Sequence, residues 1–233
     1  MEKIGIIQPG RLGDIIICLP IAKYFSSQGF KVIWPVFGEY INDLVEVIDY
    51  VDFIPVSSNV YSCVRESRSA LNYFKDIRIF DVAATFPESS CTEKYVQLGD
   101  GFGAITFDKF KYDVCGVPFD EKWNLKINRL HAQEEQVFSD LVKHEDYVVA
   151  GLEHSRGKIN LHIDSKYPIV EINKNYNFFA WIKVIEKSKH IVLVDSAMAN
   201  LVEQLNLTNK KVLVAKPGQP RPFFKNDWII ANS

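Results

Sequence analysis

Short apolar runs alternate along the first 56 residues with longer stretches in which apolar residues recur every three or four positions. The pattern predicts strands at Ile4–Ile7, Lys31–Pro35 and Val51–Val56, and helices at Asp14–Gly29 and Tyr40–Ile48. Pro20 falls inside the first helix and should kink it or delay its regular start. This order of elements favours parallel strands joined by right-handed crossovers.

The alternation continues through the rest of the chain. Further strands are predicted at Arg78–Thr85, Tyr147–Gly151, Pro168–Ile172, His190–Val194 and Lys211–Ala215. Further helices are predicted at Ser62–Phe74, 106–116, Ala132–His144, Phe178–Ser188 and Ala197–Leu205. The sequence therefore predicts two α/β domains, 1–125 and 147–233, with a linker helix in the charged segment 126–146.

Composition narrows the class of protein. Of the 233 residues, 47% are apolar and 24% are charged, as in ordinary globular domains. A formal charge of −2 argues against a mainly electrostatic nucleic-acid binder, although it leaves room for a local basic groove. No apolar run approaches the roughly 20 residues of a membrane span, and the N-terminus lacks a signal-peptide core. We therefore expect a cytoplasmic protein without a transmembrane segment.

The cysteines offer no metal site. Cys18, Cys63, Cys91 and Cys115 are scattered, without a C-x-x-C pair or a neighbouring pair of histidines. Reduced, structural cysteines are the interpretation that fits a cytoplasmic protein.

The first turn with unusual chemistry is Gln8–Asp14. It contains Gly10 and Gly13 but neither the G-x-G-x-x-G fingerprint nor a Walker A sequence. It places backbone N–H groups, Arg11 and Asp14 where a strand meets a helix, which is where open α/β sheets bind ligands. Asp14 could equally be an N-cap, with Arg11 exposed or paired to it.

Two turns of the second half are candidates for phosphate binding. Gly151–Lys158 resembles a P-loop, but five residues separate its glycines and Ile159 replaces the magnesium-binding hydroxyl. Its side chains His154, Ser155, Arg156 and Lys158 could hold a phosphate, or the turn is a solvated loop. The turn Leu193–Asn200 leads directly from a strand into a helix, so Asp195 or Ser196 could cap that helix or stand at an anion site. Together the turns of both halves would face one cleft suited to a diphosphate donor.

These residues resemble the family 9 glycosyltransferases, the heptosyltransferases of bacterial lipopolysaccharide synthesis. The resemblance is strongest over Lys3–Val56, where Gly13-Asp14-Ile15-Ile16 is followed by Leu19-Pro20. The segments 112–118, His190–Leu207 and Lys216–Pro220 also resemble the family. The resemblance implies a compact GT-B fold, in which two facing Rossmann-like domains with parallel sheets bind the acceptor (N-terminal) and the nucleotide-sugar (C-terminal). It also implies an inverting transfer without metal or other cofactor.

The resemblance assigns roles to individual residues. Asp14 matches the aspartate proposed as the base that deprotonates the acceptor hydroxyl. Donor binding falls to Arg11, Gly13, His154, Ser155, Arg156, Lys158, Asp195, Ser196, Ala197, Asn200 and Lys216. The chain departs from the family in its length, in Ala197 where a glycine is usual, and in Asn200 where a histidine is usual. These departures put ADP-heptose in doubt as the donor.

The expected partners are a nucleotide-sugar and a glycan or other hydroxyl acceptor, with transfer of a hexosyl or heptosyl group. An alternative is a glycosyltransferase acting on hydroxylated bases of nucleic acid. It rests on the aromatic residues Phe102, Phe107, Phe110 and Tyr112 beside Lys109 and Lys111. The same stripe could instead be core residues flanked by solvated lysines. A further alternative is a non-catalytic nucleotide-sugar-binding protein of the same fold.

Overall fold

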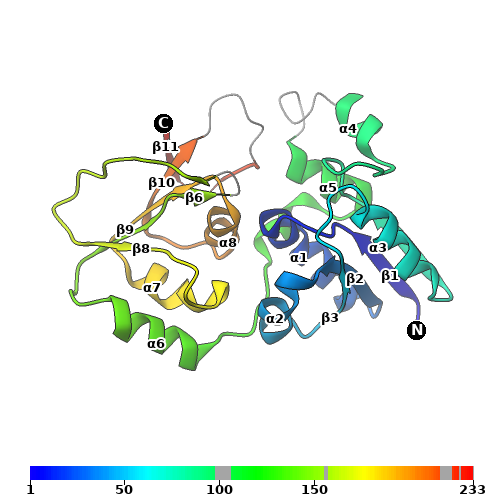
Figure 1. The fold of residues 1–233 in the computed structure, drawn as a ribbon, viewed down its shortest axis with the longest axis horizontal. Coiled ribbons are helices and arrows are strands. Elements are labelled where there is room, and N and C mark those ends of the chain that lie inside the picture. Colours follow the sequence, from blue (N-terminus) through cyan, green and yellow to red (C-terminus); the bar gives the residue numbers. More distant parts are fainter. Residues whose placement is uncertain (98–105, 155–156, 216–221, 226, 233) are drawn as a thin grey trace. The chain divides into compact units, whose positions relative to one another are not determined.

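The chain folds into two compact units (Figure 1). The computed structural model describes residues 1–97, 106–154, 157–215, 222–225 and 227–232. Met1–Asn128 and Pro220–Phe223 form the first unit, and Arg129–Gln219 and Phe224–Ser233 form the second. The expected fold class is confirmed, since each unit contains a parallel sheet with helices.

Sheet A of the first unit has the strand order β3-β2-β1-β4. Its strands are β1 (Lys3–Ile7), β2 (Lys31–Phe37), β3 (Val51–Val56) and β4 (Ile77–Asp81), and all neighbours run parallel. The helices are α1 (Leu12–Ser27), α2 (Gly38–Val47), α3 (Cys63–Asn72), α4 (Thr92–Gln97), α5 (Phe107–Cys115) and the 3₁₀ turn η1 (Phe119–Trp123). The central strand β1 therefore ends beside β4, and the loops that follow these two strands start at the same edge.

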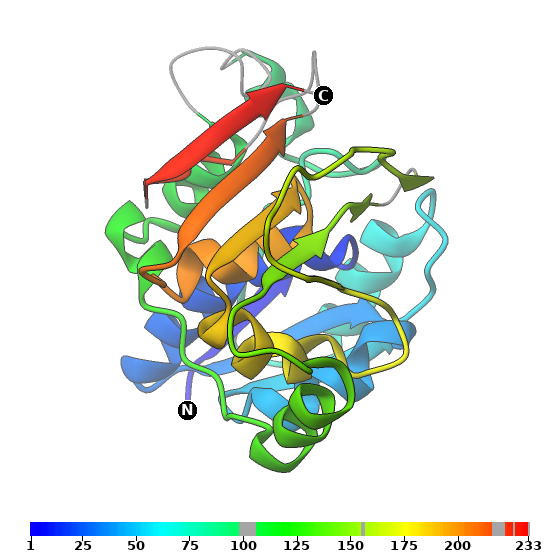
Figure 2. The same ribbon diagram turned by 90° about the vertical axis from the view of Figure 1, so that its left-hand side faces the viewer.

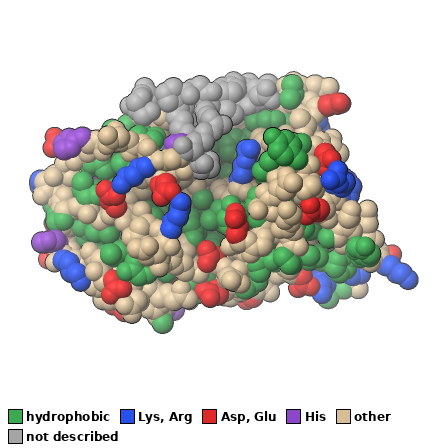
Figure 3. Space-filling view, in the orientation of Figure 1, with side chains coloured by type: hydrophobic (Ala, Val, Ile, Leu, Met, Phe, Trp, Pro, Cys, Tyr) green, Lys and Arg blue, Asp and Glu red, His purple; other side chains and the backbone are tan. Residues whose placement is uncertain are grey.

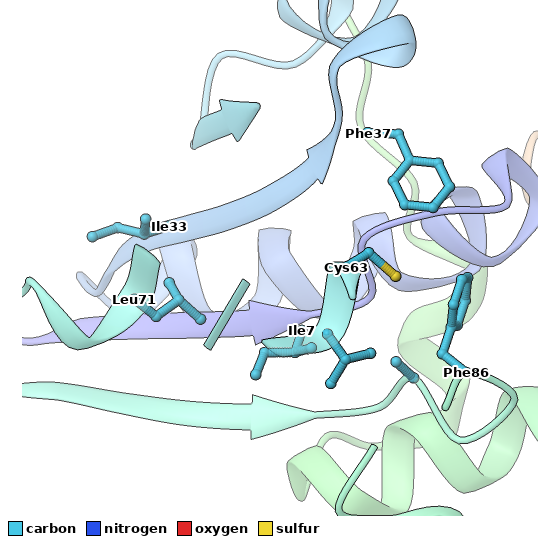
Figure 4. Close-up of a cluster of buried hydrophobic side chains, with 8 residues drawn as sticks. Ile7, Ile33, Phe37, Cys63, Leu71 and Phe86 are labelled. Carbon is cyan, nitrogen blue, oxygen red and sulfur yellow. The ribbon is translucent and has the colours of Figure 1, made fainter. Parts of the chain in front are cut away.

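Helix α3 covers one face of sheet A. Ile7 and Ile33 point to this face and join Leu71 of α3 in one buried cluster (Figure 4). Phe37 and Phe86 extend the cluster toward the carboxyl ends of the strands, where their rings meet edge to face at 6.3 Å between centroids. The core of the unit thus reaches up to the loops that carry the candidate site.

Helix α1 lies against the opposite face of sheet A. Its Phe25 stacks on Phe80, with ring centroids 5.2 Å apart, and Phe80 is in register with the buried Ile6. The side of α1 away from the sheet is covered by α5 and η1. Because it is enclosed on both sides, α1 buries every residue from Ile15 to Ala22, which explains why its sequence IIICLPIA is apolar throughout.

Sheet B of the second unit has the order β11-β10-β9-β5-β8. Its parallel strands are β5 (Val148–Gly151), β8 (Ile169–Glu171), β9 (His190–Val194), β10 (Lys210–Ala215) and β11 (Trp228–Asn232). An antiparallel hairpin of β6 (Glu153–His154) and β7 (Gly157–Lys158) follows β5. The helical elements are α6 (His131–Leu141), η2 (Phe178–Trp181), α7 (Ile182–Lys187) and α8 (Ala197–Gln204).

One face of sheet B is covered by an extended segment. Residues 159–167 run across the strands (Figure 2), and Ile159, Leu161 and Ile163 pack on Val148 and Val192. Elsewhere in the unit, α6 packs on α7 and η2. Arg129, just before α6, donates hydrogen bonds to Glu134 of α6 and to Glu186 of α7. The charged segment is therefore tied to the second unit by its own ion pairs.

Several elements differ from the sequence predictions. Helix α1 begins at Leu12, so Pro20 does not delay its start. Strand β4 ends at Asp81 and not at Thr85, because the Asp81 carboxylate accepts hydrogen bonds from the amides of Ala83 and Ser90 and turns the chain. Helix α4, the hairpin and the edge strand β11 were not predicted.

Candidate functional site

The turn between β1 and α1 is shaped by close packing. A Cβ at Gly10 would lie 2.1 Å from the Phe37 ring, so only glycine fits there. The side-chain amide of Gln8 donates to the Gly10 carbonyl at 3.0 Å. The backbone amide of Phe37 donates to the Pro9 carbonyl at 2.7 Å. The turn is thereby fixed to the end of β2, the neighbouring strand.

Asp14 lies in the first turn of α1 and does not cap it. The N-cap position is Arg11, and no side chain makes a capping hydrogen bond there. The alternative of Asp14 as an N-cap is therefore wrong, because the helix begins at Leu12 and places Asp14 third within it. At that position its negative charge still interacts favourably with the helix dipole.

Lys111 on α5 is a site residue that the sequence reasoning missed. Its ammonium donates to Gln8 Oε1 at 2.6 Å and to the Val82 carbonyl at 2.9 Å, and it lies 3.2 Å from Asp14 Oδ1. The Lys111 side chain is 3% exposed and that of Asp14 is 13% exposed. Asp14 is therefore paired with a buried cation and is itself partly exposed to solvent.

The protonation states of Lys111 and of the neighbouring Cys18 depend on their burial and on the charged groups beside them. Burial is the largest single influence on the pKa of Lys111 and lowers it, but the Asp14 carboxylate, together with the neighbouring Cys18 and Cys91, more than offsets burial and raises the pKa above 10.5. Burial also raises the pKa of the adjacent Cys18 thiol to about 12, so this thiol is neutral near pH 7. Lys111 therefore stays protonated at neutral pH, next to the Asp14 carboxylate.

Arg11 is exposed and lies at the start of α1 with a φ of 58°. Its guanidinium stands over the Phe86 ring, 5.1 Å from the centroid, and donates to Thr85 Oγ1 at 3.4 Å. Both partners belong to the loop after β4. Arg11 therefore contacts that loop and is exposed, which was one of the two alternatives predicted for it; it is not paired with Asp14.

The loop after β4 is held by the Asp81 carboxylate, whose side chain is 6% exposed. Its hydrogen-bond donors are the Arg68 guanidinium, the amides of Ala83 and Ser90, and the hydroxyls of Ser89 and Ser90. A buried carboxylate is stable when its oxygens are satisfied in this way. The network fixes the loop that carries Val82, Thr85 and Phe86 to the edge of sheet A.

In the second unit, the turn between β9 and α8 lies at the carboxyl edge of sheet B. Ser196 is the N-cap of α8 and makes no side-chain capping bond, and Ala197 is the first helical residue. Asn200 is 4% exposed and donates through Nδ2 to the Ser196 carbonyl at 3.1 Å. Its Oδ1 has no hydrogen-bond partner among the residues that the structure describes. Asp195, immediately before Ser196, is partly buried.

The hairpin after β5 lies at the same edge, since β5 and β9 are parallel neighbours. His154 pairs with Gly157 in this hairpin, and the Lys158 ammonium pairs with Glu171 at 2.6 Å on the surface. Ser155, Arg156 and Lys216, which were predicted to bind the donor, lie outside the described residues. The structure thus groups Arg11, Gly13 and Asp14 in the first unit. It groups His154, Lys158, Asp195, Ser196, Ala197 and Asn200 at one sheet edge of the second.

Phe110 and Tyr112 of α5 do not form an exposed aromatic surface. Phe110 and Tyr112 are buried, at 1% and 0% exposure, so they offer no stacking platform. Lys109 is solvated, as one interpretation expected, but Lys111 is not. Phe102 lies outside the described residues. Positive and negative side chains are interspersed on the face seen in Figure 3.

Two surface hollows lie away from the candidate residues. One, of about 490 Å³, is lined by the end of β3, by α3 and by the residues next to them, including Ser57, Arg65 and Tyr73. The other, of about 380 Å³, lies under the segment 159–167 and includes His190 and Lys210. Within the described parts of the chain, no group of three His, Cys, Asp or Glu side chains could hold a metal ion. No helix there is long and apolar enough to cross a membrane.

Comparison with solved structures shows what this arrangement resembles. A family 9 glycosyltransferase from Veillonella parvula superposes with a TM-score of 0.61 over 100% of this chain and 86% of its own, at 10% identity. The Escherichia coli heptosyltransferase WaaC, in complex with ADP-2-deoxy-2-fluoro heptose, gives 0.53 over 98% of this chain and 92% of its own, at 14% identity. The chain has the heptosyltransferase fold.

A third similar structure is TibC of enterotoxigenic E. coli, a dodecameric, iron-containing glycosyltransferase. Its TM-score is 0.54 at 11% identity, over 98% of this chain and 63% of its own. No protein-family model matches the sequence. No curated protein matches it either. The resemblance inferred from the sequence is therefore confirmed as a likeness of structure, at an identity that shows the fold alone.

Proposed function

We propose that the protein is a glycosyltransferase that moves a hexosyl or heptosyl group from a nucleotide-diphosphate sugar to a hydroxyl acceptor. The observation that carries the proposal is the Asp14 carboxylate at the carboxyl edge of sheet A, with one oxygen on the Lys111 ammonium and a side chain that is partly exposed. The sequence resemblance matches Asp14 to the aspartate proposed as the base of the family, and a carboxylate within hydrogen-bond reach of an acceptor hydroxyl can take its proton.

In the proposed reaction the first unit binds the acceptor and Asp14 takes the proton of its hydroxyl. The oxygen attacks the anomeric carbon as the bond to the diphosphate breaks, which inverts the configuration. The nucleoside diphosphate leaves with the electron pair of the broken bond and is bound by the second unit. Backbone N–H groups at the start of α8 would stabilise its charge. Arg11, Arg156, Lys158 and Lys216 are the cations proposed to assist, without a metal ion.

WaaC binds ADP-2-deoxy-2-fluoro heptose and ADP, so a nucleoside-diphosphate sugar is the donor class to test first. Ala197 and Asn200 stand where the family usually has glycine and histidine. A donor panel should therefore include ADP-heptose, ADP-glucose, UDP-glucose and GDP-mannose.

The proposal is tested by a thermal-shift screen followed by a turnover assay. A donor bound only by the folded protein raises its melting temperature, and the effect grows with donor concentration. The positive donor is then incubated with the protein and a set of glycan acceptors, and release of nucleoside diphosphate is followed by chromatography. Release above the protein-free control supports transfer or hydrolysis. A donor that binds without any release would support a non-catalytic nucleotide-sugar-binding protein and reject the proposal.

A further inference from the structure

The ammonium of Lys111 contacts polar groups from three separate segments of the first unit. Gln8 follows β1, Val82 follows β4, and Asp14 is in the first turn of α1. An ammonium group has three N–H donors and no acceptor. Two hydrogen bonds and one ion pair therefore surround this ammonium, and the lysine joins the ends of two neighbouring strands to the carboxylate.

Such a buried ion pair needs a reason other than stability. Taking two charges out of water costs several kcal/mol per ion, and an apolar pair of similar volume is often as stable. Lysines that are almost fully buried are rare unless they are paired. The partner here is the residue proposed as the base, and the Lys111 ammonium lies 3.2 Å from its Oδ1.

The arrangement leaves one carboxylate oxygen for the substrate. Oδ2 of Asp14 has no hydrogen-bond donor among the described residues, and the side chain is 13% exposed. We propose that Lys111 is a positioning residue, which fixes the Asp14 carboxylate through Oδ1 so that Oδ2 faces the acceptor hydroxyl. This inference rests on the proposed function, because it assigns the partner of the same base.

The ion pair can be tested without any substrate. The titratable groups around Lys111 are Asp14 and Cys18 of α1, Cys91 beyond β4 and Cys115 of α5. Because the Asp14 carboxylate raises the pKa of Lys111, the substitution Asp14→Asn should lower it, leaving burial as the main influence. The Cε resonance of Lys111 in carbon-13-labelled protein reports this titration. An identical pKa of Lys111 in wild type and variant would overturn the proposal.

The positioning role is tested by kinetics with the donor identified in the screen. Lys111→Met should lower kcat roughly 100-fold, because a reacting group displaced by about 1 Å costs that much. The KM for the donor and the donor-induced rise in melting temperature should stay within twofold of wild type. Lys111→Arg keeps the positive charge but not the compact ammonium, so it should recover part of the lost kcat.

Lys109 provides a matched control on the same helix. It forms an exposed pair with Asp113, and Lys109→Met should leave kcat unchanged. A kcat of Lys111→Met within twofold of wild type overturns the positioning role alone. If Lys111→Met does not fold, a wild-type kcat for Lys111→Arg overturns it instead. If the wild type itself releases no nucleoside diphosphate from any donor, the proposed function fails and the inference fails with it.

Discussion

A base for a substrate hydroxyl must be reachable from solvent and held in one orientation. Asp14 meets the first condition through its partial exposure and the second through the Lys111 ammonium. Gly10 contributes indirectly, because the Phe37 ring occupies the space where any side chain at that position would lie. The residues that shape the site are thus spread over 103 positions of sequence, from Gln8 to Lys111.

The first prediction concerns Asp14 itself. Asp14→Asn keeps the shape of the side chain but removes its basicity, so kcat should fall by roughly 10²- to 10⁴-fold. Binding of the donor should persist, since the substitution leaves the second unit unchanged. Steady-state kinetics and the thermal shift with the same donor measure the two effects. Near-normal turnover of this variant would show that Asp14 is not the base.

At the scale of single residues, the sequence allowed one member of the Asp14–Lys111 pair to be predicted. Asp14 stands out because a Gly-Asp step follows a predicted strand. Lys111 does not, because Lys109 and Lys111 look alike in FDKFKYDVC. The available signal is helical spacing, since Phe107 and Cys115 lie four residues before and after Lys111 and place it on the apolar face. Its contact with Asp14 depends on tertiary packing across 97 residues, which spacing cannot show.

Elements with a clear apolar run or period were predicted close to their observed bounds. Strands β1 and β3 and the helices α1 and α8 are examples. Elements defined by few residues were missed, since β6 and β7 have two residues each and α4 has six. The end of β4 was placed too late because VAAT continues the apolar run, whereas the Asp81 side chain bonds the following amides. Side-chain bonds of this kind leave no periodic signal.

The second prediction concerns a buried ion pair of the first unit. Phe223, which lies near the C-terminus of the chain, is hydrogen-bonded to both members of this pair. Asp108 and Lys122 are fully buried and lie 2.5 Å apart. Lys122 donates to the Phe223 carbonyl at 2.5 Å, and Asp108 accepts from the Phe223 amide at 3.0 Å. Lys122→Met leaves the Asp108 carboxylate buried without its main cation, which should reduce the free energy of unfolding by about 3–5 kcal/mol.

Urea denaturation followed by circular dichroism measures this loss. The double variant Asp108→Leu with Lys122→Met should recover part of the stability, because no buried charge is left unpaired. Lys31 and Asp52 form an exposed pair at 2.6 Å, so Lys31→Met is the control, with an expected loss of at most about 1 kcal/mol. A loss for Lys122→Met as small as that of the control would contradict the prediction.

At the scale of the whole molecule, the buried and partly buried thiols and phenols contribute to the response to alkaline pH. Burial raises the pKa of Cys18 and Tyr40 to about 12, and it also raises the pKa of Cys91, Cys115 and Tyr112. In the unfolded chain these groups titrate near 9 and 10. Between the unfolded and folded values the native state binds more protons, so stability falls as pH rises.

The third prediction follows from this fall of stability with rising pH. The contribution of these thiols and phenols to the free energy of unfolding should be constant below about pH 9 and should fall progressively above it. Urea denaturation at pH 7, 9 and 10.5 measures the slope. Cys18→Ala removes one of the contributing thiols and should make the slope shallower. An unfolding free energy that stays level to pH 10.5 would contradict the assignment of these side chains as buried and protonated.

The fold itself is shared with proteins at 10–14% identity. Such agreement is understandable because the order of apolar strands and helices determines an α/β fold, while individual side chains vary. The sequence pattern was sufficient to predict this architecture. It could not identify the sugar, the nucleotide or the acceptor, since these depend on side chains brought together by folding.

Helix α1 has a consequence for synthesis of the chain. It is apolar on all sides, and α5, the first part of its cover, ends 88 residues later, at Cys115 against Ser27. At translation rates of about 5–20 residues per second, the nascent chain carries an uncovered apolar helix for roughly 4–18 seconds. During that interval it is a ready target for chaperones and for self-association. Slow translation before Cys115 would lengthen this exposure, and a codon pause placed after η1 would not.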